Sequence, residues 1–242
     1  MRSSINFYTL NSLDLDNNVI IKRLFRYFYN VKPLKPKYTT FWPVSKLLNY
    51  LKSLFPIESL DLKTLTLKTI ALMALSSSDR GQTLHLASTK NIVVSKEKVE
   101  FVITDRTKTT RKILKPTVIT CVSTDVPELD VANHVKIYLE KTKDFRTNDN
   151  FSKLFLSWKT HRPVTKQTLS RWLTMVLKSS KIDTSVFQAH SYRGAGLSKA
   201  LSSGASISQI IKAGNWTNSS TFNTFYNAPA FDTEIGKIIL QN

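Results

Sequence analysis

The spacing of apolar residues changes along this chain, and the change restricts the folds that it can adopt. Apolar side chains recur every three or four residues in four segments, which predicts helices over about 44–54, 61–75, 129–141 and 166–178. Between the second and third helices the pattern changes to short runs rich in β-branched residues, which predict strands at 92–94, 101–103 and 113–120. This order predicts a mostly helical α+β domain with a small three-stranded antiparallel sheet.

Local signals refine this pattern. Pro116 interrupts the third run, and proline is tolerated mainly at sheet edges, so this run is predicted to be an edge strand. Ser59 precedes the second helix and is expected to cap it. The polar turn at 76–81 leads into a short helix at 82–87. Arg80 is therefore predicted to lie at a junction between two helices, where its side chain can point into a cleft.

The first part of the chain differs from the rest. Residues 19–29 have the apolar spacing of a helix. Residues 31–37 hold two prolines and three lysines, which favours an extended basic linker. About 30 residues cannot build an independent core. We expect this segment to be the end of a domain or an arm that packs elsewhere.

The charge balance indicates a polyanionic partner. The chain carries 35 Lys and Arg against 17 Asp and Glu, a formal net charge of +18. So large a charge repels itself in the folded state, and a polyanion such as double-stranded DNA is its commonest explanation. A merely soluble basic protein and a protein at an anionic membrane surface are the alternatives. No apolar run reaches the roughly 18 residues of a membrane span, so we expect no membrane partner.

Composition also limits the cofactors. One cysteine, Cys121, and four scattered histidines form neither an internal disulfide nor a convincing zinc site, so we expect no metal and no cofactor. The sequence has no glycine-rich phosphate loop with Lys and Ser or Thr, which argues against an NTPase. It also has no carboxylate cluster of the kind that two-metal nucleases use.

The last quarter of the chain carries the most specific pattern. It contains Ala-His-Ser-Tyr-Arg-Gly at 189–194, Gly-Asn-Trp at 214–216 and Phe-Tyr at 225–226. His190 and Arg193 are three residues apart, so on a helix they share a face and can clamp a phosphate. The tyrosine of the last motif, on another helix, can place a hydroxyl beside that clamp. These groups are the parts needed to cut and rejoin a DNA phosphodiester without a metal.

Together with Arg80 and Lys108, these residues resemble the catalytic set of the tyrosine recombinase (phage integrase) family. That set is an Arg after a helix, a Lys on a β-hairpin, His-x-x-Arg, a His or Trp, and a Tyr. The resemblance covers roughly residues 42–230. The stretch 215–226 and the linker 32–37 look most like recombinases of eukaryotic mobile elements, the Crypton and DIRS-like groups. The resemblance implies a tyrosine-recombinase catalytic fold and DNA recombination or integration by an enzyme of a transposable element.

The resemblance also implies catalytic roles. Tyr226 would be the nucleophile, forming a 3′-phosphotyrosyl intermediate that needs neither ATP nor metal. Arg80 and Arg193 would hold the non-bridging oxygens of the scissile phosphate. Lys108, in the basic connection between the second and third strands, would protonate the leaving 5′ oxygen. The family usually has an acidic residue three positions after the first arginine, where this chain has Thr83.

Several roles stay open between alternatives. His190 can accept the tyrosine proton or hydrogen-bond the phosphate. Trp216 stands where many family members have a second histidine; its indole N–H can donate a hydrogen bond but cannot accept a proton. A core tryptophan is the structural alternative. Arg106, Arg111 and Lys112 compete with the neighbouring lysine for the role of general acid.

The resemblance divides the chain into three parts. Residues 1–37 would be a partial DNA-clamping segment with a basic linker, 38–226 the catalytic domain, and 227–242 a tail that docks on a neighbouring copy or packs on its own domain. Basic residues of the linker and the hairpin are expected to contact DNA: Lys35, Lys37, Arg106, Arg111 and Lys112. Strand exchange in the family uses four protomers, which implies a homo-oligomer, a synaptic tetramer on DNA. A eukaryotic element would place the protein in the nucleus; otherwise it would lie at the nucleoid in the cytoplasm.

Two other functions are compatible with these residues. A type IB topoisomerase shares the tyrosine chemistry and would relax supercoils as a monomer. A domesticated DNA-binding protein would bind without cutting, although it needs no tyrosine at position 226. Covalent trapping on nicked or suicide DNA separates these functions from recombination.

Overall fold

The computed structural model describes residues 18–32, 37–105, 116–146, 152–214, 216, 219 and 222–223. The chain divides into two compact units, Met1–Lys37 and Tyr38–Asn242. In the first unit the predicted helix is found as α2 (Val19–Val31), which Asn18 caps by accepting a hydrogen bond from the backbone N–H of Ile21. None of the residues of α2 is buried. The assignment of residues 1–37 to a DNA-clamping domain stays a prediction.

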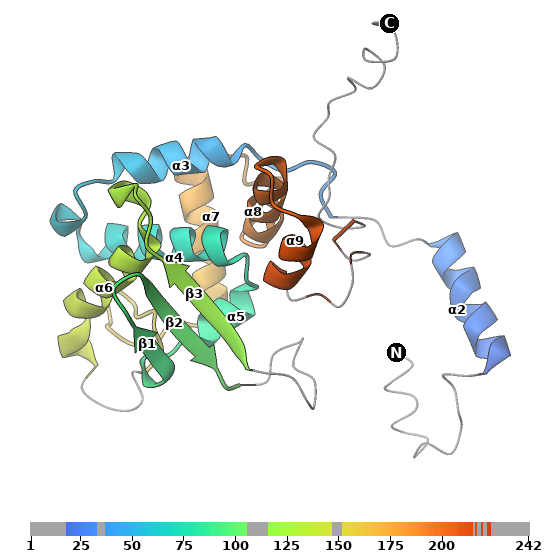
Figure 1. The fold of residues 1–242 in the computed structure, drawn as a ribbon, viewed down its shortest axis with the longest axis horizontal. Helices are drawn as coiled ribbons and strands as arrows, with labels where there is room; N and C mark the ends of the chain where they lie inside the picture. Colours follow the sequence, from blue (N-terminus) through green and yellow to red (C-terminus); the bar gives the residue numbers. More distant parts are fainter. Residues whose placement is uncertain are drawn as a thin grey trace, which may run out of the picture. The chain divides into compact units, whose positions relative to one another are not determined.

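Among its described residues, the second unit contains the four helices predicted from the apolar spacing, the short helix predicted after the polar turn, and two further helices after residue 190. Their bounds are α3 (Val44–Ser53), α4 (Leu62–Ser77), α5 (Gly81–Leu86), α6 (Val131–Lys141), α7 (Lys166–Ser179), α8 (Ser191–Ser202) and α9 (Ile207–Ala213). Helix α4 runs through the middle and contacts α6, α7 and α8 (Figure 1). Neighbours on several sides explain why every residue of α4 from Lys68 to Ala74 is buried.

The expected cap of α4 was wrong. Ser59 instead ends a short 3₁₀ turn, and its hydroxyl donates to the carbonyl of Pro56 at 2.8 Å. Asp61 is the N-cap, because its carboxylate accepts from the backbone N–H of Thr64 at 3.0 Å. An N-cap must directly precede the first helical residue to reach the N–H groups of the first turn, and only Asp61 stands there.

The three predicted strands form one antiparallel sheet in the order β1 (Ile92–Val94), β2 (Lys98–Ile103) and β3 (Thr117–Val122). The third strand lies at an edge, as predicted, but it begins at Thr117, so Pro116 precedes the strand and does not interrupt it, because proline has no N–H for the ladder. Phe101 pairs with Ile92 on one side and with Ile119 on the other. The buried face of the sheet packs on α4 and α6. These contacts confirm the predicted α+β architecture.

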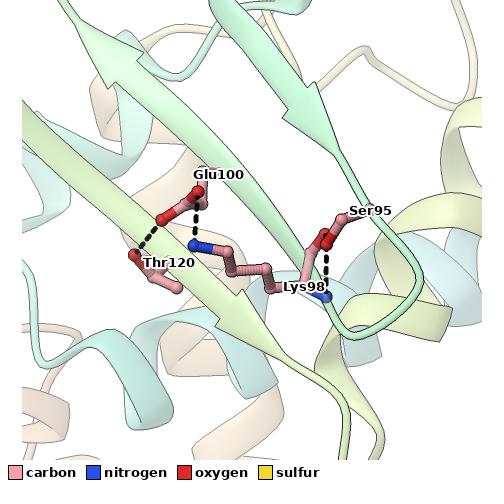
Figure 2. A network of polar contacts seen from close by, with 4 residues as sticks. All are labelled: Ser95, Lys98, Glu100 and Thr120. Atoms are coloured by element: carbon pink, nitrogen blue, oxygen red, sulfur yellow. Dashed lines mark hydrogen bonds and ion pairs between the residues drawn. The ribbon is translucent and has the colours of Figure 1, made fainter.

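The outer face of the sheet carries a small network of polar contacts, one of which crosses between strands (Figure 2). The Nζ of Lys98 lies 2.9 Å from Glu100, and the hydroxyl of Thr120 on the next strand donates to Glu100 at 3.4 Å. Ser95 accepts from the backbone N–H of Lys98 in the turn before β2. An exposed ion pair contributes at most about 1 kcal/mol. These contacts therefore add little to the stability of the domain. They lie on the solvent-exposed face of the sheet and are consistent with the pairing of β2 with β3.

Two titratable side chains are fully buried near the junction of α4 and α6. Lys68 donates to the carbonyl of Leu54 at 2.6 Å, and burial lowers its pKa to about 8. The Nδ1 of His134 lies 2.5 Å from the carbonyl oxygen of Asp130, so Nδ1 is the protonated nitrogen. Burial lowers the pKa of His134 to about 4, and its Nε2 has no hydrogen-bond partner among the described residues. A proton added there would be a buried, unpaired charge.

Acid should therefore weaken the fold through His134. The unfolded chain takes up this proton near pH 6.5 and the folded chain only near pH 4, so stability falls as the pH drops through that window. Urea unfolding at pH 7 and pH 4.5 should show wild type losing about 2 kcal/mol relative to His134→Gln. An equal loss of unfolding free energy in wild type and His134→Gln would show that protonation of His134 is not the cause.

Candidate functional site

A tight turn after α4 sets the position of the first predicted arginine. Ser78 ends α4 in the left-handed conformation, with φ of 54°. The chain then reverses through Asp79, and Arg80 becomes the N-cap residue of α5. The predicted junction between two helices is confirmed. Because both helices pack on α7, the turn between them is held against the body of the domain.

This turn borders a cleft of about 320 Å³. Three of the residues predicted to act on a phosphate line it together: Arg80, His190 and Arg193. Asp79 from the turn and Lys166 from the start of α7 line it as well. Two arginines, a histidine and a lysine around one cavity suit an anionic group such as a phosphodiester.

Arg193 is the most buried charged side chain of the cleft. It is only 5% exposed, and its guanidinium donates to the carbonyl of Ser78 at 2.8 Å and to the carbonyl of Gly214. The guanidinium carbon also lies 4.5 Å from the ring of Trp216. A buried cation needs such hydrogen bonds to offset its lost hydration. Arg193 thus connects α8 to the turn after α4 and to the loop after α9.

Trp216 packs against this arginine. Its ring lies 5.8 Å from that of Phe222, beside the small apolar cluster that α8 and α9 form. A Cβ at Gly214 would lie 2.2 Å from the Trp216 ring, so this position admits only glycine without a rearrangement. Trp216 is therefore half-buried and packed between the Arg193 guanidinium and the ring of Phe222. The hydrogen bond that it was predicted to give a phosphate stays a prediction.

His190 occupies a different place from the one that the spacing predicted. It is the N-cap residue of α8 and lies just outside the helix, whereas Arg193 lies within the first turn. The φ and ψ of His190, −74° and −12°, are nonetheless helical, so both residues still line the cleft. His190 is exposed, and its Nδ1 lies 3.1 Å from the hydroxyl of Tyr38. Sequence analysis missed Tyr38, because nothing in the local pattern pairs residues so far apart.

Asp79 is the second group that sequence analysis missed. Burial raises the pKa of its carboxyl to about 6, against the opposing effect of the positive charges on Arg193 and Arg80. Thr83, where the family usually has an acid, is buried on α5. Among the described residues that line the cleft, the acidic side chain is that of Asp79, which directly precedes Arg80. Lys166 was also missed, since a lysine at the start of a helix carries no distinctive signal.

The other predicted site residues lie outside the described part of the chain. These are Lys35, Arg106, Lys108, Arg111, Lys112 and Tyr226. Lys37 is described and exposed, at the end of the first unit. Within the described ranges, no group of His, Cys, Asp or Glu could hold a metal ion. The helices there include none that is long and apolar enough to cross a membrane.

Comparison with known proteins gives similarity in structure only. No family model matches the sequence, and no curated protein sequence matches it. The fold is similar to that of XerA recombinase, with 14% identity and a TM-score of 0.58 over 88% of this chain and 68% of that one. It is also similar to XerH site-specific recombinase bound to a palindromic difH substrate in a post-cleavage complex, with 12% identity and a TM-score of 0.61.

A third similar structure is the Tn1549 transposon integrase in complex with transposon right-end DNA, with 13% identity and a TM-score of 0.56 over 88% of this chain and 69% of the integrase. The match to XerH covers 84% of this chain but only 54% of XerH, so this chain spans about half of that protein. The mostly helical domain with its three-stranded antiparallel sheet therefore has the fold of a tyrosine recombinase catalytic domain.

Proposed function

We propose that this chain cleaves and rejoins DNA as a tyrosine recombinase, through a 3′-phosphotyrosyl intermediate. The observation that carries the proposal is the convergence of Arg80, His190 and Arg193 on one cleft, within a recombinase fold. These residues come from the turn after α4 and the start of α8, which are more than 100 residues apart in the sequence. A net charge of +18 supports a DNA partner.

The arginines would stabilise the transition state of phosphoryl transfer. When a hydroxyl attacks a phosphodiester, negative charge grows on the non-bridging oxygens. Arg80 is half-exposed at the rim and Arg193 is buried in the wall, so one guanidinium meets the substrate from solvent and the other is fixed beforehand. A preorganised charge needs no reorganisation at the moment of reaction, which is why it stabilises a transition state strongly.

The remaining steps involve Tyr226 and Lys108. The phenolic oxygen of Tyr226 forms a bond to phosphorus while the bond from phosphorus to the 5′ oxygen breaks. Lys108 gives its proton to that 5′ oxygen, and the phenolic proton leaves with a base. The covalent bond keeps the energy of the phosphodiester, so a second hydroxyl can reverse the step without ATP. His190 either takes the phenolic proton or donates a hydrogen bond to the phosphate.

The wider setting of this reaction is also part of the proposal. XerH is solved on a palindromic substrate and the Tn1549 integrase on transposon-end DNA, which supports a DNA site read by more than one copy and an origin in a mobile element. We propose a synaptic tetramer, with the tail 227–242 docking between copies. The Crypton or DIRS-like assignment, and the nuclear location that it implies, rest on the sequence resemblance alone.

Replacing the nucleophile tests the proposal directly. Tyr226→Phe removes one hydroxyl and keeps the ring, so it should bind DNA like wild type but form no covalent adduct on a suicide substrate that traps the intermediate. Tyr29→Phe, on the exposed face of α2, is the matched control and should form adducts normally. Adducts in Tyr226→Phe would reject the nucleophile, and their absence in wild type would favour a non-cleaving DNA-binding protein.

Chelation should not affect the chemical step. The charges that stabilise the transition state are guanidinium groups, which stay ionised at any working pH. Single-turnover cleavage in EDTA should therefore equal cleavage in Mg²⁺ at matched ionic strength. A strict requirement for Mg²⁺ would contradict the proposal, and relaxation of supercoiled plasmid by monomers would instead favour a type IB topoisomerase.

Lys108 can be tested as the general acid by changing the leaving group. Lys108→Ala should cleave ordinary DNA roughly 10²–10⁴-fold more slowly, with little change in affinity. A substrate with sulfur at the 5′ bridging position has a better leaving group and should restore its rate. Arg80→Ala is the control, because its loss lies in charge stabilisation and sulfur should not restore it. Arg193 suits this purpose less, since it is buried and bonded to two carbonyls.

If sulfur fails to restore Lys108→Ala, the lysine is not the acid. If Lys108 only contacts a phosphate, Lys108→Ala should bind DNA slightly more weakly than wild type. The slope of log affinity against log salt concentration should then be smaller by about one. The search would then move to Arg111 and Lys112 in the same connection.

A further inference from the structure

Tyr38 contacts His190 through both its hydroxyl and its ring. The hydroxyl oxygen lies 3.1 Å from the Nδ1 of His190, and the two rings stack with centroids 4.8 Å apart at an angle of 24°. Tyr38 is only 7% exposed, whereas His190 is exposed. A hydrogen bond and a stacked ring together restrict both torsions of the histidine side chain. An exposed imidazole at the end of a helix would otherwise sample several rotamers.

Tyr38 is itself held in place by aromatic neighbours. Its ring centroid lies 5.3 Å from that of Phe187 and 6.0 Å from that of Phe41. The ring of Phe41 in turn occupies the space where a side chain at Gly194 would begin, 2.1 Å from an ideal Cβ. The hydroxyl that meets His190 is thus fixed by packing against α8 and the segment before it.

The direction of the hydrogen bond follows from the acidities of the two groups. A phenol O–H is a stronger hydrogen-bond donor than the N–H of a neutral imidazole, and an unprotonated imidazole nitrogen is a good acceptor. The backbone N–H of Gln188 also points at the Tyr38 oxygen, at 3.4 Å, and uses one of its lone pairs. Both effects favour Tyr38 donating to Nδ1. The ring proton of His190 then lies on Nε2.

We infer that Tyr38 is a positioning residue that holds His190 in the tautomer protonated on Nε2, so that His190 donates a hydrogen bond to the scissile phosphate. This inference rests on the proposed function. With Nδ1 accepting from Tyr38 and Nε2 carrying a proton, the ring has no nitrogen ready to take the proton of Tyr226. The phenolic proton passes to solvent, while the Nε2–H stabilises charge on a non-bridging oxygen alongside the arginines.

The tautomer can be measured without any DNA. In protein labelled with ¹⁵N-histidine, His190 should show a protonated Nε2 and an unprotonated Nδ1, with its signals assigned by their loss in His190→Gln. Tyr38→Phe keeps the ring stack and removes the hydroxyl, so it should populate both tautomers. Tyr50→Phe, a half-buried tyrosine outside the cleft, should leave the signals unchanged. A proton on Nδ1 in wild type would overturn the inference.

Cleavage kinetics test the donor role separately. A glutamine amide N–H can replace Nε2–H as a donor but cannot accept a proton, so His190→Gln should retain far more activity than His190→Ala, which should lose roughly 10–100-fold. Equal losses in both variants would mean that His190 acts as a base and would overturn the inference. Tyr38→Phe should cleave more slowly with unchanged DNA affinity.

The two failures are distinguishable. If wild type has the expected tautomer but forms no covalent adduct, the proposed function fails and the positioning contact stands. If wild type cleaves but its histidine carries the proton on Nδ1, the function stands and the positioning contact fails.

Discussion

The buried guanidinium of Arg193 is the contact on which the rest of the site depends. It donates to the carbonyls of Ser78 and Gly214, the C-cap residues of α4 and α9, and so ties the ends of these two helices to the start of α8. A charge that is only 5% exposed must keep such partners, because an unpaired buried cation is very costly. The helix ends cannot move apart without breaking these bonds, so the buried guanidinium holds the turn that carries Asp79 and Arg80 close to the start of α8, where these residues line the cleft together.

The same arrangement explains how positive charges can gather in a small space. Arg193 and Arg80 both lower the pKa of the Asp79 carboxyl, which burial raises to about 6. The carboxyl in turn offsets part of the repulsion between the guanidinium groups. The family usually places an acid three residues after the first arginine, where Thr83 is buried instead. An acid one position before the arginine supplies negative charge to the same cleft from the turn itself.

The parts of the fold that sequence predicted were those with strong local signals. Helices α3, α4, α6 and α7 and all three strands follow from apolar spacing, because each buries one face or all faces against a neighbour. The cap of α4 was misplaced by two residues, since serine and aspartate are equally good caps and only the exact helix start selects Asp61. The residues of the basic hairpin and Tyr226 lie outside the described part of the chain, so their placement stays a prediction.

Sequence by itself determined the fold class through apolar spacing, and the resemblance of its motifs to a known family predicted that Arg80, His190 and Arg193 would act on one phosphate, in keeping with the cleft that they line together. Only the tertiary structure decided which groups touch them. Tyr38 reaches His190 across 152 positions, and the carbonyl partners of Arg193 lie 115 and 21 positions away. Contacts of this kind arise from packing between elements, so no local pattern records them, and they set the protonation and the orientation on which the proposed chemistry depends.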